Sequence, residues 1–165
     1  MVDLQSALLP QQSWDHIPLF LHVRYADFTP EDYQLMAKVK LVTIQPHTPQ
    51  IPGETQVAIV KKQLGSLAPH VPVMLYWNVF YSEPIYKANQ ELMRHPELCA
   101  HTPDGKLYLP GNRLVFNMSN TRTQDFWIDV VTKAVGDGTA DGVLVDNACG
   151  SGLPFLSAPE QKAFE

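Results

Sequence analysis

The chain has 165 residues, enough for one domain with a sizeable core, and 45% of them are hydrophobic and 18% charged, as in an ordinary globular protein. The formal net charge is −5 and no basic run occurs, which argues against nucleic acid and anionic membrane as partners. No segment approaches membrane-spanning length and the N-terminus does not resemble a signal peptide, so we expect a cytoplasmic protein, or an extracellular one if the N-terminus is incomplete.

The first half of the chain alternates predicted strands with predicted helices. In chain order we expect a strand at 19–23, a helix from Thr29 to about Lys38, a strand at 40–45, a helix at about 54–67 and a strand at 71–77. The first helix begins with an N-cap threonine, a proline and two acids. In the second helix, Val57, Val60, Leu64 and Leu67 are expected to face the core. This alternation predicts a parallel sheet covered by helices.

The second half is less regular. We expect a helix at 82–94 with Ile85, Leu92 and Met93 in the core, a hairpin or lid loop at 101–111, an extended segment at 114–118, a helix at 121–135 and a strand at 142–145. The sequence from Ser157 to Glu160 predicts a further helix start, after which the chain continues for about one turn. We therefore interpret residues 1–165 as a single domain, the N-terminal half of a (β/α)8 barrel truncated after its fourth strand.

Polar and aromatic residues follow the predicted parallel strands. The candidates for substrate binding at these strand ends are Arg24, Tyr25, Asp27, Gln45, His47, Tyr76, Trp77, Asn78 and Asn147. The carboxyl ends of parallel strands share one rim, where ligands bind. Acids, amides and rings on one rim suit a sugar, whose hydroxyls accept and donate hydrogen bonds. The alternative is that strand ends are polar simply because the following loops are exposed.

Asp146 is the candidate catalytic residue, because it follows an apolar strand directly and its backbone should be rigid. A glycosidase needs such a carboxylate as nucleophile or general base, together with a second carboxyl that donates a proton. Asp27, Glu83 and Asp104 are the alternatives for that second group. The competing interpretation of Asp146 itself is a cap for the next loop.

Three consecutive segments carry a family resemblance. Val115-Phe116-Asn117-Met118-Ser119-Asn120, a helix containing Phe126-Trp127, and Asp141-Gly142-Val143-Leu144-Val145-Asp146-Asn147 resemble glycoside hydrolase-like family 15 and, more distantly, the α-galactosidase type. The resemblance spans most of residues 19–150. In the α-galactosidase type an Asp-x-(Ser/Thr)-Asn-Pro segment precedes the helix, and the last aspartate of an Asp-Gly-x-x-x-Asp strand is the nucleophile.

The resemblance implies a barrel glycosidase in which Asp146 is the nucleophile. The chain departs from the pattern at two positions, since Asn117 replaces the aspartate of the first motif and Thr121 replaces its proline. Asn117 is therefore retained as a substrate-binding candidate rather than as an acid. In such barrels the acid/base comes from a later strand, which this sequence does not contain.

These observations predict hydrolysis of O-glycosidic bonds in an oligo- or polysaccharide, without a cofactor. The alternative is a non-catalytic carbohydrate-binding module or an inactive barrel fragment. A flavodoxin-like domain is disfavoured because no phosphate-binding loop follows the first strand. His95, Cys99 and His101 have a spacing compatible with a metal, but no fourth ligand is evident, and surface histidines near a helix end explain them; we expect no metal.

A half-barrel would leave two sheet edges and an apolar sheet face uncovered, and such surfaces pair with other chains. We therefore expect homo-oligomers at sub-millimolar concentration, which analytical ultracentrifugation would detect. A monomer across that concentration range would contradict the half-barrel interpretation.

Overall fold

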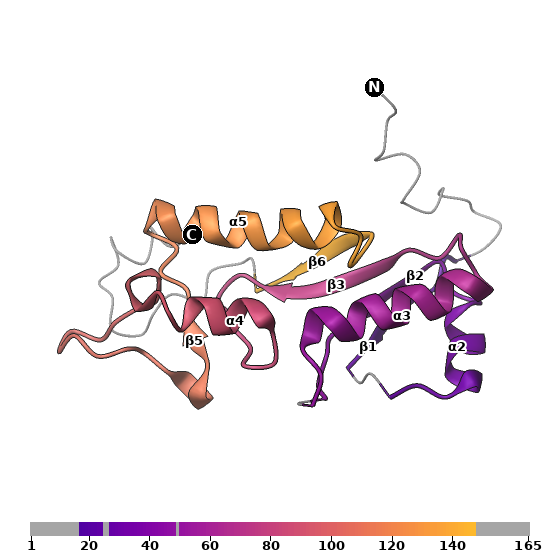
Figure 1. Ribbon diagram of the computed structural model, residues 1–165, viewed down its shortest axis with the longest axis horizontal. Coiled ribbons are helices and arrows are strands. Elements are labelled where there is room, and N and C mark those ends of the chain that lie inside the picture. The colour runs from indigo at the N-terminus through magenta and orange to yellow at the C-terminus, as the bar shows by residue number, and fades with distance from the viewer. Residues whose placement is uncertain (1–16, 25–26, 49, 148–165) are drawn as a thin grey trace, which may run out of the picture. The chain divides into compact units, whose positions relative to one another are not determined.

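The computed structural model describes residues 17–24, 27–48 and 50–147, which Figure 1 traces as alternating strands and helices. The elements are β1 (Phe20–Val23), α2 (Pro30–Met36), β2 (Leu41–Ile44), α3 (Gly53–Leu67), β3 (Val73–Asn78), β4 (Tyr81–Ser82), α4 (Lys87–Leu92), β5 (Leu114–Val115), α5 (Thr121–Gly136) and β6 (Gly142–Asp146), with short 3-10 helices at Pro96–Leu98 and Pro110–Asn112. The predicted helix start at Ser157 lies outside the described residues.

Four parallel strands form one sheet in the order β1-β2-β3-β6, as the sequence predicted. Phe20 of β1 pairs with Leu41 of β2, and Val42 of β2 pairs with Val73 of β3. A second, two-stranded sheet joins β4 and β5 in antiparallel fashion. The chain divides into two compact units, residues 1–76 with 134–144 (unit 1) and residues 77–133 with 145–165 (unit 2).

The core of unit 1 is apolar and fully buried. In α3, Val57, Val60 and Leu64 have no exposed area, and the three successive residues Val42, Thr43 and Ile44 of β2 are equally buried. A strand buried on both of its faces is what a parallel sheet between two layers requires. Leu67 was expected in this core but is 50% exposed, whereas Ala68, four residues after Leu64, continues the buried stripe at 2%.

The start of α2 confirms the predicted capping signal. The backbone N–H of Asp32 donates to the hydroxyl of Thr29 at 3.3 Å, and the backbone N–H of Thr29 donates to the Asp32 carboxylate at 2.8 Å. The hydrogen bonds from the backbone and then the hydroxyl of Thr29 hold the pKa of Asp32 below its usual value. The helix ends at Met36, two residues before the predicted end at Lys38.

Asp141 fixes the beginning of β6 to β3 and α3. Its carboxylate accepts the backbone N–H of Val73 at 2.8 Å and lies 2.9 Å from Nζ of Lys61, and its own N–H donates to the Val73 carbonyl at 2.8 Å. The first aspartate of the Asp-Gly-x-x-x-Asp sequence is therefore a structural residue.

Replacing Asp141 by alanine should lower the free energy of unfolding by about 1–3 kcal/mol, because the N–H of the buried Val73 loses its acceptor. Urea denaturation would measure the change. Lys61→Ala removes only the ion pair and should cost less than about 1 kcal/mol. Equal losses in the two variants would show that the ion pair, rather than the backbone hydrogen bond, is what stabilises this junction.

The helix predicted at 82–94 is much shorter in the structure. Tyr81 and Ser82 pair with β5 instead, and α4 begins only at Lys87. Pro84 accounts for the difference, because a proline disfavours helical backbone in the residue before it and cannot donate a helical hydrogen bond. Leu92 is fully buried as expected, but Met93 is 66% exposed, which corrects its assignment to the core.

The loop at 101–111 contains the predicted hairpin. His101 pairs with Leu107 in antiparallel fashion, and the N–H of Thr102 donates to the carbonyl of Lys106 at 2.8 Å. Gly105 has a φ of 81°, a conformation that favours glycine, and this explains the Asp-Gly turn signal.

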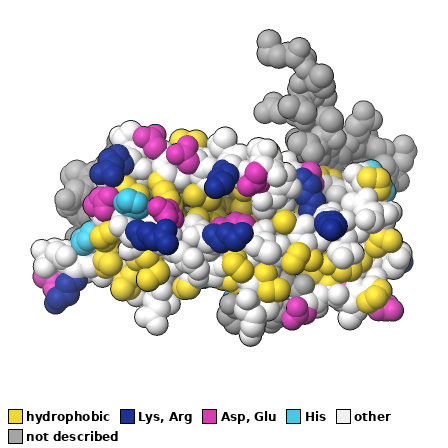
Figure 2. All heavy atoms as spheres, in the orientation of Figure 1, with side chains coloured by type: hydrophobic (Ala, Val, Ile, Leu, Met, Phe, Trp, Pro, Cys, Tyr) yellow, Lys and Arg dark blue, Asp and Glu magenta, His cyan; other side chains and the backbone are white. Residues whose placement is uncertain are grey.

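The edge strand β1 exposes apolar side chains, since Leu19 is 64% and Phe20 is 52% exposed. Exposed apolar groups on an edge strand favour pairing with a second chain. Self-association remains a prediction. On the face drawn in Figure 2, Lys and Arg side chains lie among Asp and Glu side chains.

Candidate active site

In unit 1, side chains from three neighbouring strands meet on one face of the sheet. Nε2 of His22 lies 3.2 Å from Oε1 of Gln45, and the His22 ring contacts the Tyr76 ring edge-on with centroids 5.7 Å apart. The register explains this grouping, because His22 pairs with Thr43, and Thr43 pairs with Met74. Gln45 and Tyr76 each follow by two residues and so share that face.

His22 was missed by the sequence interpretation. The sequence does contain a signal for it. His22 is a single polar residue inside the apolar run at 19–23, and its strand position turns its side chain to the same face as the candidates at the strand end. Gln45 and Tyr76 were predicted, and the structure brings them together through this histidine.

The other strand-end candidates of unit 1 are more scattered. Arg24 and Asp27 are exposed in the segment after β1, and His47 is exposed after β2. Tyr25 lies outside the described residues. Arg24, Asp27 and His47 therefore stand as solvent-facing side chains near strand ends.

Gly142, the first residue of β6, lies against the Met74 side chain of β3. A Cβ at this position would lie 2.5 Å from Cε and 3.0 Å from Sδ of Met74, so Gly142 faces the β3 side chain that lies next to Tyr76 on the same sheet face. Side chains alternate along a strand, so Asp146, four residues later, is on the same face of β6 as Gly142. A larger residue at the second position of the Asp-Gly-x-x-x-Asp sequence would displace the end of the Met74 side chain.

Asp146 of unit 2 is half-buried and its backbone is held at the end of β6. Its carbonyl accepts the N–H of Val79 at 3.0 Å, and its Oδ1 accepts the N–H of Asn147 at 2.8 Å. Asn147 has a φ of 55°, a left-handed conformation that asparagine tolerates better than most residues. These contacts define the position of the carboxylate at the carboxyl end of the strand.

Asn78 shapes the turn that follows β3. It is 2% exposed, and its Oδ1 accepts the N–H groups of Phe80 at 2.8 Å and Tyr81 at 3.0 Å. Its carbonyl accepts Nε1–H of Trp127 at 3.1 Å. The side-chain oxygen expected to bind substrate thus accepts hydrogen bonds from the loop backbone.

Trp77 belongs to the core of unit 2 rather than to a binding surface. Its side chain is 1% exposed and packs edge-on against Tyr86, with centroids 4.7 Å apart, and at a tilt against Phe116 at 6.4 Å. It lies on the opposite face of β3 from Tyr76, since consecutive side chains alternate. Trp77 therefore offers no free ring face to a sugar, contrary to the prediction.

Asn117 lies in the turn before α5. Its N–H donates to the carbonyl of Leu98 at 2.9 Å, and its Oδ1 accepts the hydroxyl of Ser119 at 2.6 Å. The side chain is half-buried, and these two hydrogen bonds stabilise the turn before α5.

Two of the alternatives for the proton donor are paired with cations. The Glu83 carboxylate lies 3.5 Å from Arg113, and the Asp104 carboxylate lies 2.7 Å from Nζ of Lys106. The hydrogen bond from Lys106 and that from Thr102 lower the pKa of Asp104. A general acid needs a raised pKa, so Asp104 is unsuited to donate a proton at neutral pH.

The residues considered for a metal have protein partners. His95 lies 3.3 Å from Glu97 and 3.5 Å from Glu91, while Nδ1 of His101 lies 3.0 Å from the carbonyl oxygen of Cys99. Among the residues that the structure describes, no group of three His, Cys, Asp or Glu side chains is arranged to hold a metal ion.

Cys99 should be chemically inert in the folded chain. Burial, and then the negative charge of Glu97, raise the pKa of its thiol to about 11. Only about 0.1% of it is then thiolate at pH 8, and the thiolate is the reactive form. The sequence has one other cysteine, Cys149, and in a Cys149→Ser variant a thiol reagent at pH 8 should label Cys99 only after denaturant is added. Rapid labelling of the native variant would contradict this.

Comparisons with known proteins identify relatives of this chain. The model of a family described as "Hypothetical glycosyl hydrolase family 15" matches residues 66–161. No curated protein matches. Among solved structures, a GH36 α-galactosidase, AgaA from Geobacillus stearothermophilus, is 16% identical with a TM-score of 0.55, covering 90% of this chain and 24% of its own. A maltogenic α-amylase, AmyB from Thermotoga neapolitana, is 15% identical with a TM-score of 0.56, covering 79% and 39%.

At these identities the likeness shows the fold, which is that of part of a (β/α)8 barrel, as predicted. The chain spans about a quarter of the length of the α-galactosidases that it matches. Within the described ranges, none of the helices combines the length and the apolar character needed to cross a membrane.

Proposed function

Because the chain belongs to hypothetical glycosyl hydrolase family 15, whose model matches 66–161, we propose that it takes part in the hydrolysis of O-glycosidic bonds. Asp146 acts as nucleophile or general base. The observation that carries the proposal is the position of Asp146, half-buried at the carboxyl end of β6, with its backbone held by Val79 and Asn147. A carboxylate held in place in this way avoids the entropic cost of orienting it for reaction.

The cluster of His22, Gln45 and Tyr76 is the best-formed sugar-binding group of unit 1. The exposed imidazole of His22 and the half-buried amide of Gln45 are the accessible polar groups, and the Tyr76 ring, 6% exposed, packs edge-on against His22 beneath them. Such groups can donate and accept hydrogen bonds with sugar hydroxyls. Substituting His22 by alanine should weaken carbohydrate binding without a large change in stability, because this side chain is exposed.

The relatives suggest which carbohydrates to test first. The α-galactosidase AgaA has been crystallised with stachyose and with raffinose, and AmyB is a maltogenic α-amylase. We propose α-galactosides and α-glucans as substrate classes, to be tested with the aryl α-glycosides of galactose and glucose, stachyose, raffinose and maltooligosaccharides.

The alternative function is carbohydrate binding without turnover. It is favoured by the pairing of Glu83 with Arg113 and of Asp104 with Lys106, which leaves the proton donor unidentified. One experiment separates the two functions, namely hydrolysis and binding assays on the same panel with the wild type and Asp146→Asn. Turnover by the wild type alone supports the enzyme, whereas binding without turnover in both proteins supports the binding module.

A further inference from the structure

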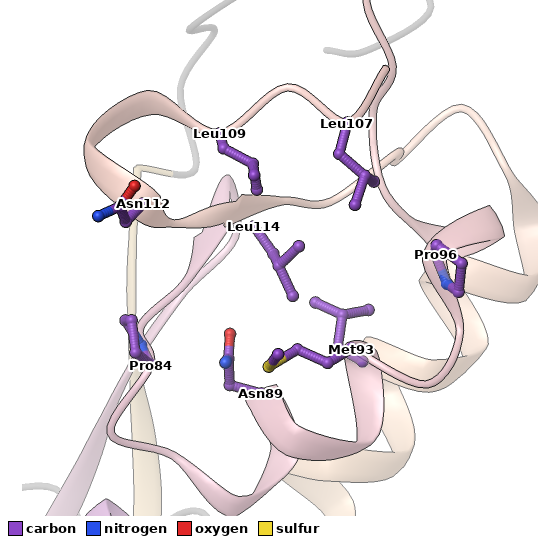
Figure 3. A pocket seen from close by; sticks show the side chains of 9 residues that line it. Pro84, Asn89, Met93, Pro96, Leu107, Leu109, Asn112 and Leu114 are labelled. Atoms are coloured by element: carbon purple, nitrogen blue, oxygen red, sulfur yellow. The ribbon is translucent and has the colours of Figure 1, made fainter. Parts of the chain in front are cut away.

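Unit 2 contains a pocket that the proposed hydrolysis does not use. Its cavity volume is about 420 Å³, and Figure 3 shows side chains converging on it from α4, from the hairpin loop and from β5. The lining residues are Pro84, Asn89, Leu92, Met93, Pro96, Leu107, Leu109, Asn112 and Leu114. A cavity of this size falls within the range of small-molecule sites, which is about 300–1,000 Å³.

The lining is apolar and uncharged. Seven of its nine described residues are leucine, methionine or proline, and the other two are asparagines. Burying an ion in such surroundings without a compensating charge is costly, so a charged ligand is excluded. The lining therefore selects a neutral and mainly apolar molecule.

One polar atom in the pocket lacks a partner. Asn89 is 5% exposed, and among the residues that the structure describes no group donates a hydrogen bond to its Oδ1. Figure 3 shows this oxygen directed into the pocket, toward Leu114. A buried acceptor without a donor costs about 1–3 kcal/mol, and a ligand that donates to it would remove that cost.

We propose that this pocket binds a neutral, mainly apolar small molecule whose single O–H or N–H group donates to Oδ1 of Asn89. The apolar part fills the space between Leu92, Met93 and Leu114. The site is independent of Asp146 and of carbohydrate hydrolysis, so either proposal can fail alone.

Two probes of similar shape test the proposal on the full chain. 1-Naphthol carries a donor, and 1-methoxynaphthalene carries none. Titrated into ¹³C-methyl-labelled protein, both should shift the methyl signals of Leu92, Met93 and Leu114, and 1-naphthol should bind roughly tenfold more tightly. Equal affinities, or methyl signals that respond to neither probe because another part of the chain fills the pocket, would overturn the proposal.

Three variants test where the probes bind and whether Asn89 causes the preference for 1-naphthol. Asn89→Leu, of similar size, should abolish the preference for 1-naphthol and raise the melting temperature of the unliganded protein, because the unpartnered acceptor is gone. Gln90→Leu changes the exposed neighbour on α4 and should leave the preference intact. Leu109→Trp, at a position that is 45% exposed, should block both probes without unfolding the chain. An unchanged preference in a folded Asn89→Leu variant would overturn the role of Asn89.

Discussion

Asp146→Asn should lower kcat/KM for the hydrolysed glycoside by about 10³-fold, since a carboxylate that takes a proton or attacks carbon cannot be replaced by a neutral amide. The asparagine oxygen can still accept the N–H of Asn147, so the melting temperature should change little. Steady-state kinetics with an aryl glycoside, together with thermal unfolding, would measure both quantities.

Asp141→Asn is the matched control. It makes the same chemical change five residues earlier, at a carboxylate that binds Val73 and Lys61. It should reduce stability while leaving turnover by the folded fraction nearly unchanged. If Asp141→Asn abolished turnover in the folded protein and Asp146→Asn did not, the assignment of Asp146 would be wrong.

Trp77→Ala should lower the free energy of unfolding by about 3–5 kcal/mol, the usual cost of removing a large aromatic ring from a core. The indole packs between Tyr86 and Phe116 with 1% of its surface exposed. Trp77→Phe should cost much less, because it keeps a ring against both neighbours. Urea denaturation followed by circular dichroism would compare the two variants.

A Trp77 ring that bound a sugar would give the opposite result, a loss of affinity rather than of stability. If Trp77 contacted substrate, Trp77→Ala would weaken carbohydrate affinity while the protein kept its stability. His22→Ala provides the contrast, because that side chain is exposed and lies in the cluster with Gln45 and Tyr76. Loss of binding in Trp77→Ala at unchanged stability would reinstate Trp77 as a ligand.

The fold could be predicted from sequence because its signals are local. The Thr-Pro-Glu-Asp sequence at Thr29 forms a capping box, and Val57, Val60 and Leu64 repeat at helical spacing. Strand and helix alternation then leaves few topologies for the sheet. The family resemblance was confirmed by the match over 66–161.

The site was harder to predict, because a strand buried on both faces gives no alternation of polar and apolar residues. In β3, Tyr76, Trp77 and Asn78 are all buried, and only the register with β2 shows that Tyr76 faces His22. The role of Asn78 depends on the turn from Asn78 to Tyr81, which composition does not reveal. Pro84 did carry a local signal against a long helix, but the apolar spacing after it favoured one.

The two aspartates of the Asp-Gly-x-x-x-Asp sequence differ in a way that bears on how related genes are interpreted. Asp141 accepts the backbone N–H of Val73 and pairs with Lys61, whereas Asp146 is the carboxylate to which we assign the chemistry. A relative that keeps Asp141 and replaces Asp146 would retain the junction with β3 but lose the proposed chemistry. Under the proposed function, the residue at position 146 would distinguish enzymes from inactive relatives in this family.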